Sequence, residues 1–207
     1  MLKVGLTGGM SCGKSVVGEM FVALGAHLIQ SDLVAHQLLQ PGEPVYEEVI
    51  KHFGSGILNP DKSVNRARLA EAAFGQPSRI EELNRIVHPA VIDRENRWME
   101  EIAQQEPHAI AMVEAALILE ARAQKRFDRL IVVTCRPEQR IERWALRSKV
   151  DSESARREVT RRMAAQLPDE EKIKAADYVI DNSGSLDKTR EQVRQVYQKL
   201  QAEKERT

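Results

Sequence analysis

The chain has 207 residues, of which 42% are hydrophobic and 30% charged, a composition typical of a globular protein that buries one α/β core with insertions. Its 31 basic and 31 acidic side chains cancel, so no basic surface suggests nucleic acid, and its 4% aromatic content offers few platforms for stacking bases. No apolar run in the sequence approaches the roughly 20 residues that a membrane span requires.

A first strand is expected over residues 2–7, followed at once by the glycine-rich stretch Gly8–Ser15 and by a helix over residues 15–24. The stretch fits the P-loop pattern G-x-x-x-x-G-K-[ST], in which backbone N–H groups converge on phosphate oxygens. In that pattern Lys14 reaches the β- and γ-phosphates of ATP, and the Ser15 hydroxyl ligates Mg²⁺. The residues predicted to hold the nucleotide are Gly8, Gly9, Ser11, Cys12, Gly13, Lys14, Ser15 and Val16.

A second short strand, predicted to be buried, is expected over residues 27–30, and a helix over residues 33–39. Asp32 lies between them and allows two interpretations. Ligands of open α/β sheets gather at the carboxyl ends of strands, so Asp32 is placed to face the P-loop. Aspartate is also a favoured N-cap, so it equally suits the start of the following helix. Position alone leaves both open, and one residue can do both.

Residues 45–105 carry a helical pattern, with helices expected over 66–74, from Ser78, and over 90–105 after an interruption at His88-Pro89. Such an insertion between the second and third strands of a P-loop protein usually holds the phosphate acceptor. The alternative is a structural appendage or an oligomer surface.

The third expected strand, residues 109–114, is apolar and ends in Glu114, like the Walker B element that orients Mg²⁺. The alternative is an acid that caps the next turn. Residues 115–124 are predicted to be helical and include Glu120. A fourth strand is expected over residues 130–135.

Residues 136–162 hold nine basic and five acidic side chains. Four of the basic residues share one face of a helix that begins near Pro137: Arg136, Arg140, Arg143 and Arg147. In the second half of the segment, acidic and basic residues three or four apart can pair, which indicates an ordinary solvent-exposed helix face. In the first half, the basic residues have few acidic residues at that spacing. We therefore favour a lid that closes over ATP and whose arginines stabilise charge on the transferring phosphoryl group.

A fifth strand over residues 176–182 ends beside the P-loop face, so adenine is expected near Asn182, before a helix from Ser185. The two cysteines, Cys12 and Cys135, show no metal-ligand spacing and are read as reduced thiols. A lowered pKa is predicted for the Cys12 thiol, since it precedes a helix. The sequence opens directly into the first strand, so we expect no signal peptide and a cytoplasmic protein.

Four stretches taken together resemble the dephospho-CoA kinase family: residues 6–9 leading into 13–15, 31–36, 83–89 and 176–184. The resemblance implies transfer of the γ-phosphoryl group of ATP, with Mg²⁺, to the ribose 3′-hydroxyl of dephospho-CoA, the last step of coenzyme A synthesis. It also implies an α/β fold: a three-layer P-loop kinase core with a five-stranded parallel sheet, a helical substrate domain and a helical lid.

The resemblance further implies a nucleotide-binding core of residues 1–32, 108–139 and 172–207, a CoA-substrate domain of residues 33–107, and a lid of residues 140–171. It makes Asp32 the general base, with Lys14 and Arg140 or Arg143 also catalytic. It places the substrate near Thr7, Asp32, Arg85 and His88, adenine near Asn182, and the metal near Ser15 and Glu114. It suggests a monomer or weak homo-oligomer acting on a small molecule, with neither nucleic acid nor membrane as partner.

The chain departs from the family pattern in two places. Ser11-Cys12 stand where the family usually has Gly-Ser, and the family's Asp-x-Pro-Leu-Leu-x-Glu segment reads Glu114-Ala115-Ala116-Leu117-Ile118-Leu119-Glu120, without the proline. Two rival functions stay open at this point: a kinase for another small alcohol or a nucleotide, and a nucleotide-gated switch. The absence of an Asn-Lys-x-Asp guanine-reading stretch from the sequence argues against the switch.

Overall fold

The computed structural model of the chain describes residues 1–74 and 77–204. These residues form two compact units, Met1–Ile29 with Glu101–Thr207, and Gln30–Glu100. The predicted boundaries between core, substrate domain and lid stay predictions, and residues 140–171 belong to the same compact unit as the sheet.

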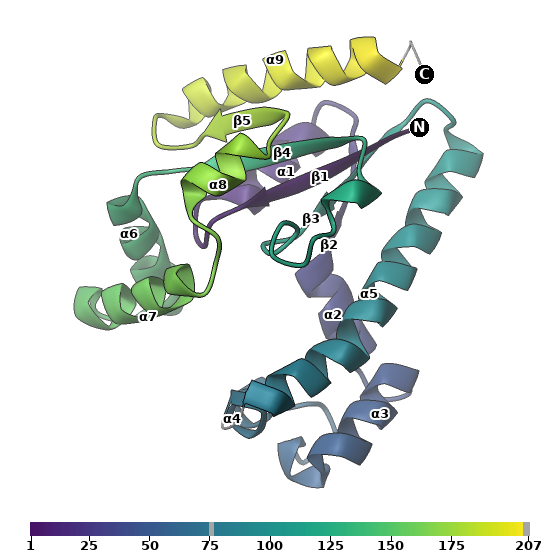
Figure 1. Ribbon diagram of the computed structural model, residues 1–207, viewed down its shortest axis with the longest axis vertical. Helices are drawn as coiled ribbons and strands as arrows, with labels where there is room; N and C mark the ends of the chain where they lie inside the picture. The colour runs from purple at the N-terminus through teal and green to yellow at the C-terminus, as the bar shows by residue number, and fades with distance from the viewer. Residues whose placement is uncertain (75–76, 205–207) are drawn as a thin grey trace. The chain divides into compact units, whose positions relative to one another are not determined.

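The first unit is built on one sheet, which in the described part of the chain has five strands in the order β2-β3-β1-β4-β5. The strands are β1 (Leu2–Gly8), β2 (His27–Gln30), β3 (Ile110–Glu114), β4 (Arg129–Thr134) and β5 (Tyr178–Asp181). Strand β1 runs parallel to both β3 and β4, and β4 runs parallel to β5, as Figure 1 shows. The predicted α/β fold with a five-stranded parallel sheet is therefore confirmed.

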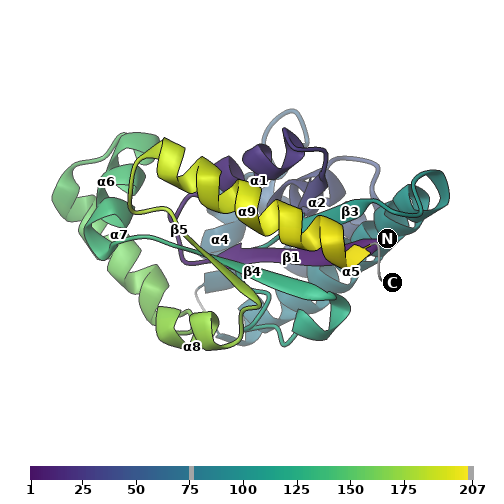
Figure 2. The ribbon, with the colours of Figure 1, turned by 90° about the horizontal axis from the view of Figure 1, so that it is seen from above.

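The core lies on both faces of the central strands. Helices α1 (Lys14–Val22) and α9 (Leu186–Lys204) contact each other on one face, and Figure 2 shows α9 running along the sheet. Their apolar side chains pack on inward-facing strand residues such as Val4, Leu6 and Ile131, each fully buried. A smaller cluster, which contains Ile118, Leu119 and Leu130, packs in the turn segment that follows β3. Edge strand β2 is only half-buried, so the prediction of a buried strand there was wrong.

The second unit is helical, with α2 (Ser31–Leu38), α3 (Pro44–Phe53), the 3₁₀ turn η1 (Ser55–Ile57), α4 (Arg66–Phe74) and most of α5 (Pro77–Gln105). The predicted interruption at His88-Pro89 is wrong, because α5 runs through Pro89. Val87, Val91 and Met99 continue one buried stripe at helical spacing across the proline. Burial of that stripe outweighs the roughly 3 kcal/mol that a proline costs inside a helix.

A helix was predicted over residues 115–124, but residues 116–122 form turns and lead into the 3₁₀ turn η2 (Gln124–Arg126). Arg122 takes a positive φ of 53°, which a right-handed helix does not allow. The side chains of Ile118 and Leu119 are both buried in this segment.

The segment after β4 forms α6 (Pro137–Ser148), α7 (Ser152–Ala164) and the short α8 (Asp169–Lys174). Helices α6 and α7 pack together, and the guanidinium groups of Arg147 and Arg162 both lie over the Trp144 ring, 4.8 and 4.9 Å from its centroid. Arg162 also pairs with Glu158, and Arg157 with Glu153, as the sequence spacing predicted.

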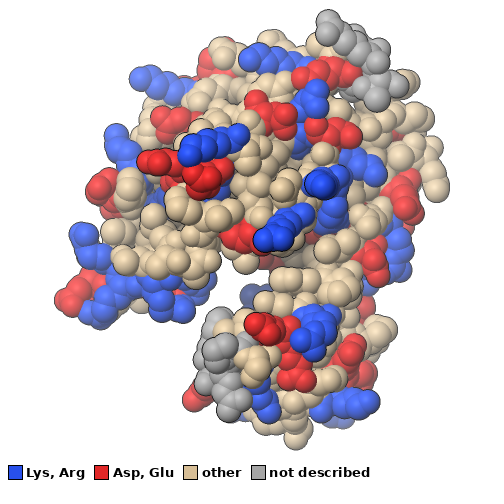
Figure 3. All heavy atoms as spheres, viewed as in Figure 1, with Lys and Arg blue, Asp and Glu red and all other residues tan. Residues whose placement is uncertain are grey.

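Figure 3 shows basic and acidic side chains interspersed over the visible face, in keeping with the neutral composition. Along the described part of the chain, no helix combines the length and apolar character needed to cross a membrane.

Candidate active site

The P-loop turns sharply between β1 and α1, and its backbone explains its glycines. Gly13 has a φ of 94°, which favours glycine, and it directly precedes the first residue of α1. A Cβ added to Gly8 would collide with the carbonyl oxygen of Val133 on β4. The loop thus lies tightly against the carboxyl end of the sheet, where its amide groups and the N-terminus of α1 can receive phosphate.

Lys14 and Ser15, the residues predicted to hold the phosphates and the metal, lie at the N-terminus of α1. The Lys14 ammonium donates to the carbonyl oxygens of Gly8 and Gly9, each at 3.2 Å, so it lies across the loop. The Ser15 hydroxyl donates to Glu114 Oε1 at 2.8 Å. Glu114 ends β3 and pairs in register with Leu6 of β1, which brings its carboxylate to the P-loop.

The Ser15–Glu114 pair has the chemistry that suits Mg²⁺, a hard cation that prefers oxygen ligands. Within residues 1–74 and 77–204, no three His, Cys, Asp or Glu side chains gather as an all-protein metal site. Mg²⁺ in phosphoryl-transfer sites is usually held by one or two side-chain oxygens together with substrate phosphates and water. The residues present therefore fit a magnesium ion that arrives with ATP.

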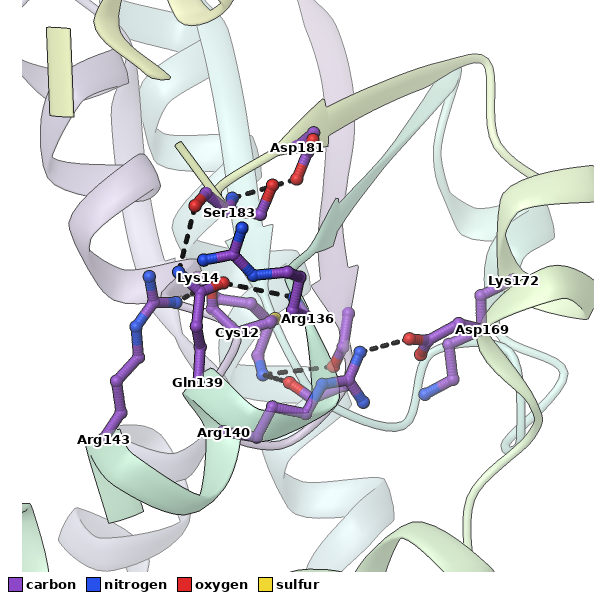
Figure 4. Close-up of polar contacts among 12 residues, drawn as sticks. Cys12, Lys14, Arg136, Gln139, Arg140, Arg143, Asp169, Lys172, Asp181 and Ser183 are labelled. Atoms are coloured by element: carbon purple, nitrogen blue, oxygen red, sulfur yellow. Dashed lines mark hydrogen bonds and ion pairs between the residues drawn. The ribbon is translucent and has the colours of Figure 1, made fainter. Parts of the chain in front are cut away.

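A second set of contacts braces the P-loop from the side of β5. The Asn182 amide donates to the carbonyl oxygen of Cys12 at 2.9 Å, and its own oxygen accepts from the Thr189 hydroxyl at 2.9 Å. Arg143 of α6 donates to the same Cys12 oxygen at 3.2 Å (Figure 4) and to the carbonyl oxygen of Asn182 at 2.9 Å. The predicted adenine contact of Asn182 stays a prediction, and in the structure its side chain holds the loop.

Arg140 is almost completely buried, with 1% of its surface exposed. Its guanidinium lies on Gly9, because a Cβ added there would collide with it, Nη1 being the nearest atom. Its Nη2 pairs with Asp169, the first residue of α8 (Figure 4). Burial by itself would lower the pKa of Arg140, but the charge and hydrogen bond of Asp169, with a smaller contribution from Cys135, raise it. Arg140 therefore stays charged beside the P-loop.

The predictions made for Cys12, Thr7 and Val16, in and beside the P-loop, have different outcomes. The predicted low pKa of Cys12 is wrong: the thiol is fully buried, and burial raises its pKa, with the charge of Lys14 opposing the shift. Thr7 is also fully buried, and its hydroxyl donates to the carbonyl oxygen of Ala116 at 3.3 Å, so it anchors the turn after β3. Its predicted substrate contact stays a prediction. Val16 lies at the start of α1 and is 43% exposed. Its predicted contact with the nucleotide stays a prediction.

Asp32 belongs to the second unit, at the second position of α2, and is exposed. Its interpretation as an N-cap is wrong, since Gln30 occupies that position, although an acid in the first turn still favours the helix. The preceding Ser31 donates to the buried Glu95 of α5 at 2.5 Å, which anchors this turn. The predicted alignment of Asp32 with the P-loop stays a prediction.

Arg85 and His88, the other predicted substrate contacts, are exposed three residues apart on α5. That spacing puts them on one face of the helix.

The family model for dephospho-CoA kinase matches residues 2–188 of the chain. This chain belongs to the dephospho-CoA kinase family. That family comprises enzymes of the final step of coenzyme A biosynthesis, the ATP-dependent phosphorylation of dephospho-CoA.

Curated relatives and solved structures agree with this assignment. A dephospho-CoA kinase of Aquifex aeolicus is 38% identical over 200 residues, 97% of this chain and 98% of the relative. One of Syntrophotalea carbinolica is 40% identical over 193 residues, 93% of this chain and 89% of the relative. The crystal structure of TT1252 from Thermus thermophilus covers 96% of this chain and 97% of its own, with a TM-score of 0.78 and 29% identity. The dephospho-CoA kinase of Campylobacter jejuni covers 97% of each chain, with a TM-score of 0.69 and 25% identity.

The acidic partners of two buried cations, Arg140 and Lys172, were not predicted from the sequence. Asp169 pairs with Arg140 from 29 residues away, and Glu120 pairs with the fully buried Lys172 from the turn after β3. No local spacing connects these residues. The only available signal was the excess of arginines without near partners between residues 136 and 147.

Proposed function

We propose that this protein transfers the γ-phosphoryl group of ATP to the ribose 3′-hydroxyl of dephospho-CoA and releases CoA and ADP. The observation that carries the proposal is the P-loop whose Ser15 meets Glu114, within a chain that matches the family model almost throughout. The geometry suits phosphoryl transfer, which asks the protein mainly for positioning and for neutralisation of charge.

The nucleotide half of the site would work as follows. Backbone N–H groups of the P-loop receive the β- and γ-phosphates, and Lys14 leaves the carbonyl oxygens of Gly8 and Gly9 to meet them. The Ser11 hydroxyl is buried and, among the described residues, makes no hydrogen bond, so it suits a phosphate oxygen. Ser15 and Glu114 would hold Mg²⁺, which would neutralise charge on the phosphates when bound.

Arg140 and Arg143 are proposed to act on the same phosphates from α6. Arg140 already presents Nη1 to the P-loop while Asp169 holds Nη2. A guanidinium carries five N–H donors, so the ion pair leaves donors for a phosphoryl oxygen. Arg143 is tied to two backbone carbonyl oxygens, and its role is more that of a brace for the loop.

The acceptor half is assigned to the second unit. Asp32 accepts the proton of the 3′-hydroxyl as its oxygen attacks the γ-phosphorus, and the bridging oxygen leaves with ADP. Arg85 and His88 lie exposed on α5 and would contact dephospho-CoA, together with Thr7 of β1. We also propose a cytoplasmic protein that acts as a monomer or weak homo-oligomer.

An acceptor panel tests the reaction. ADP release from ATP and Mg²⁺ is measured with dephospho-CoA, AMP, CMP or adenosine, and the product is identified by mass. We expect turnover only with dephospho-CoA, and a preference for another acceptor would overturn the proposal. In the same assay Asp32→Asn should lower kcat by roughly 10²- to 10⁴-fold with little change in ATP affinity. Near-normal turnover of this variant would remove the base role and leave the reaction standing.

A further inference from the structure

A buried ion pair lies in the sheet-containing unit, outside the P-loop. Lys172 of α8 is fully buried, and its Nζ lies 2.8 Å from Glu120 Oε1. Taking both charges out of water costs several kcal/mol per ion, and replacing such a pair by apolar residues is often neutral or stabilising. Stability alone therefore explains this buried lysine poorly. The position that the ion pair enforces on α8 explains it better.

The pair fixes the start of α8 at two points. Glu120 Oε1 also accepts a hydrogen bond from the backbone N–H of Leu167 at 3.0 Å. Leu167 precedes Pro168, the N-cap of α8, so one carboxylate holds both the entry to the helix and Lys172 within it. Glu120 itself stands six residues after Glu114, in the turn segment that follows β3. Helix α8 is thereby tied to the strand whose last residue meets Ser15.

The first residue of α8 then reaches the P-loop through Arg140. Asp169 pairs with Arg140 Nη2, while Nη1 is the guanidinium atom nearest to Gly9 (Figure 4). Asp169 stands three residues before Lys172, close to one helical turn, so whatever fixes Lys172 also fixes Asp169. The contacts form a continuous path from Glu120 to the P-loop.

We propose that Lys172 and Glu120 are positioning residues for phosphoryl transfer. They hold α8 so that Asp169 orients the Arg140 guanidinium with Nη1 toward the phosphate site. The inference rests on the proposed role of Arg140. Neither residue of the pair touches the nucleotide, and their effect on turnover passes through the orientation of one cation. A displacement of about 1 Å in such a group can cost roughly 100-fold in rate.

The test compares steady-state kinetics of Lys172→Met with those of Lys172→Arg and of the control Lys174→Met. Lys174 lies on the same helix and pairs with Glu171 at 2.7 Å, but its side chain is 70% exposed. We expect Lys172→Met to lower kcat by roughly 10- to 100-fold with KM for dephospho-CoA nearly unchanged. Lys172→Arg should recover most of the activity, and the control should match the unmodified protein.

A double-mutant comparison separates positioning from general stability. If Lys172 acts through Asp169, the Asp169→Asn/Lys172→Met protein should have about the same kcat as the single variant with the lower kcat. Effects that multiply would overturn the proposal, and so would a Lys172→Met protein that melts earlier but turns over normally at low temperature. If Lys172→Met does not fold, Glu120→Gln tests the proposal by the same criteria. The glutamine side-chain oxygen can still accept the hydrogen bond from the Leu167 N–H, so the variant removes only the negative charge.

Arg140→Met belongs in the same panel to separate two kinds of failure. If it leaves kcat unchanged, the proposed role of Arg140 is wrong, and the present inference falls with it. If Arg140→Met lowers kcat and Lys172→Met does not, only the positioning role is wrong.

Discussion

Replacing Asn182 by alanine removes the side chain that joins the end of β5 to the P-loop. Two hydrogen bonds are lost, the one to the carbonyl oxygen of Cys12 at 2.9 Å and the one from the Thr189 hydroxyl at 2.9 Å. Neither partner is left without a contact. Arg143 still donates to Cys12 at 3.2 Å, and Thr189 still reaches the carbonyl oxygen of Ser185 at 3.4 Å. The penalty of an orphaned buried group therefore does not apply in full.

The expected loss of stability follows from those two bonds. A hydrogen bond contributes about 0.5–1.5 kcal/mol net, so the free energy of unfolding should fall by roughly 1–3 kcal/mol. For a chain of this size each kcal/mol lowers Tm by about 2–4 °C, which predicts a decrease of roughly 2–12 °C. Because the lost donor acts on a P-loop carbonyl, KM for ATP should also rise, by roughly 3- to 10-fold, equivalent to about 1 kcal/mol of binding.

Thermal unfolding and steady-state kinetics at varied ATP check both effects, and Gln192→Ala is the matched control. Gln192 of α9 also makes two bonds of 2.9 Å at the end of β5, but both go to the backbone of Asp181 and none to the P-loop. The control should lose some stability and keep its KM for ATP. An Asn182→Ala protein with unchanged Tm and KM, or two variants that raise KM equally, would contradict this role of Asn182.

Three further predictions concern the metal, the buried thiol and Glu158 of α7. Ser15→Ala and Glu114→Gln should each raise the Mg²⁺ concentration for half-maximal turnover by roughly tenfold, since each removes a ligand or its charge; an unchanged titration would exclude them as ligands. Native Cys12 should resist iodoacetamide at neutral pH, because burial raises its pKa, and peptide mass analysis should find it alkylated only after unfolding; rapid native labelling would contradict its burial. The hydrogen bond from Arg161, opposed by desolvation and reinforced by Arg162, lowers the pKa of Glu158 from 4.5 to about 2, so its stabilising contribution is present above pH 4.5 and is lost toward pH 2. Glu158→Gln should accordingly melt below the unmodified protein at neutral pH and alongside it near pH 2, and a gap that persists at low pH would contradict the shift.

Local sequence patterns predicted much of the nucleotide side of the protein. The spacing of Gly8, Gly13 and Lys14 requires a particular backbone turn, and the strands that meet it are short apolar runs with few alternative conformations. The pairs Glu153–Arg157 and Glu158–Arg162 were also predictable, because a helix brings residues four apart together whatever surrounds it.

Where burial competes with local preference, the tertiary structure decided the outcome. Helix α5 continues through Pro89 because burial of its apolar stripe stabilises the helix more than the proline destabilises it. The segment after β3 forms turns in which Ile118 and Leu119 pack on Leu130 of β4, a contact that residue spacing along the chain does not predict. The Cys12 thiol has a raised pKa because it is packed beneath the loop, a fact that its place before a helix does not reveal.

The P-loop, the strands of the parallel sheet and the family could all be predicted from short stretches of sequence, because each pattern lies within residues close together in the chain. The residues that surround the loop could not be predicted in this way, because they come from distant parts of the chain. Cys12 receives Arg143 from 131 residues away and Asn182 from 170, and Arg140 finds Asp169 across two helices. The physical reason is that strand order and register set these approaches, with β1 placed between β3 and β4, and no spacing along the chain encodes that order.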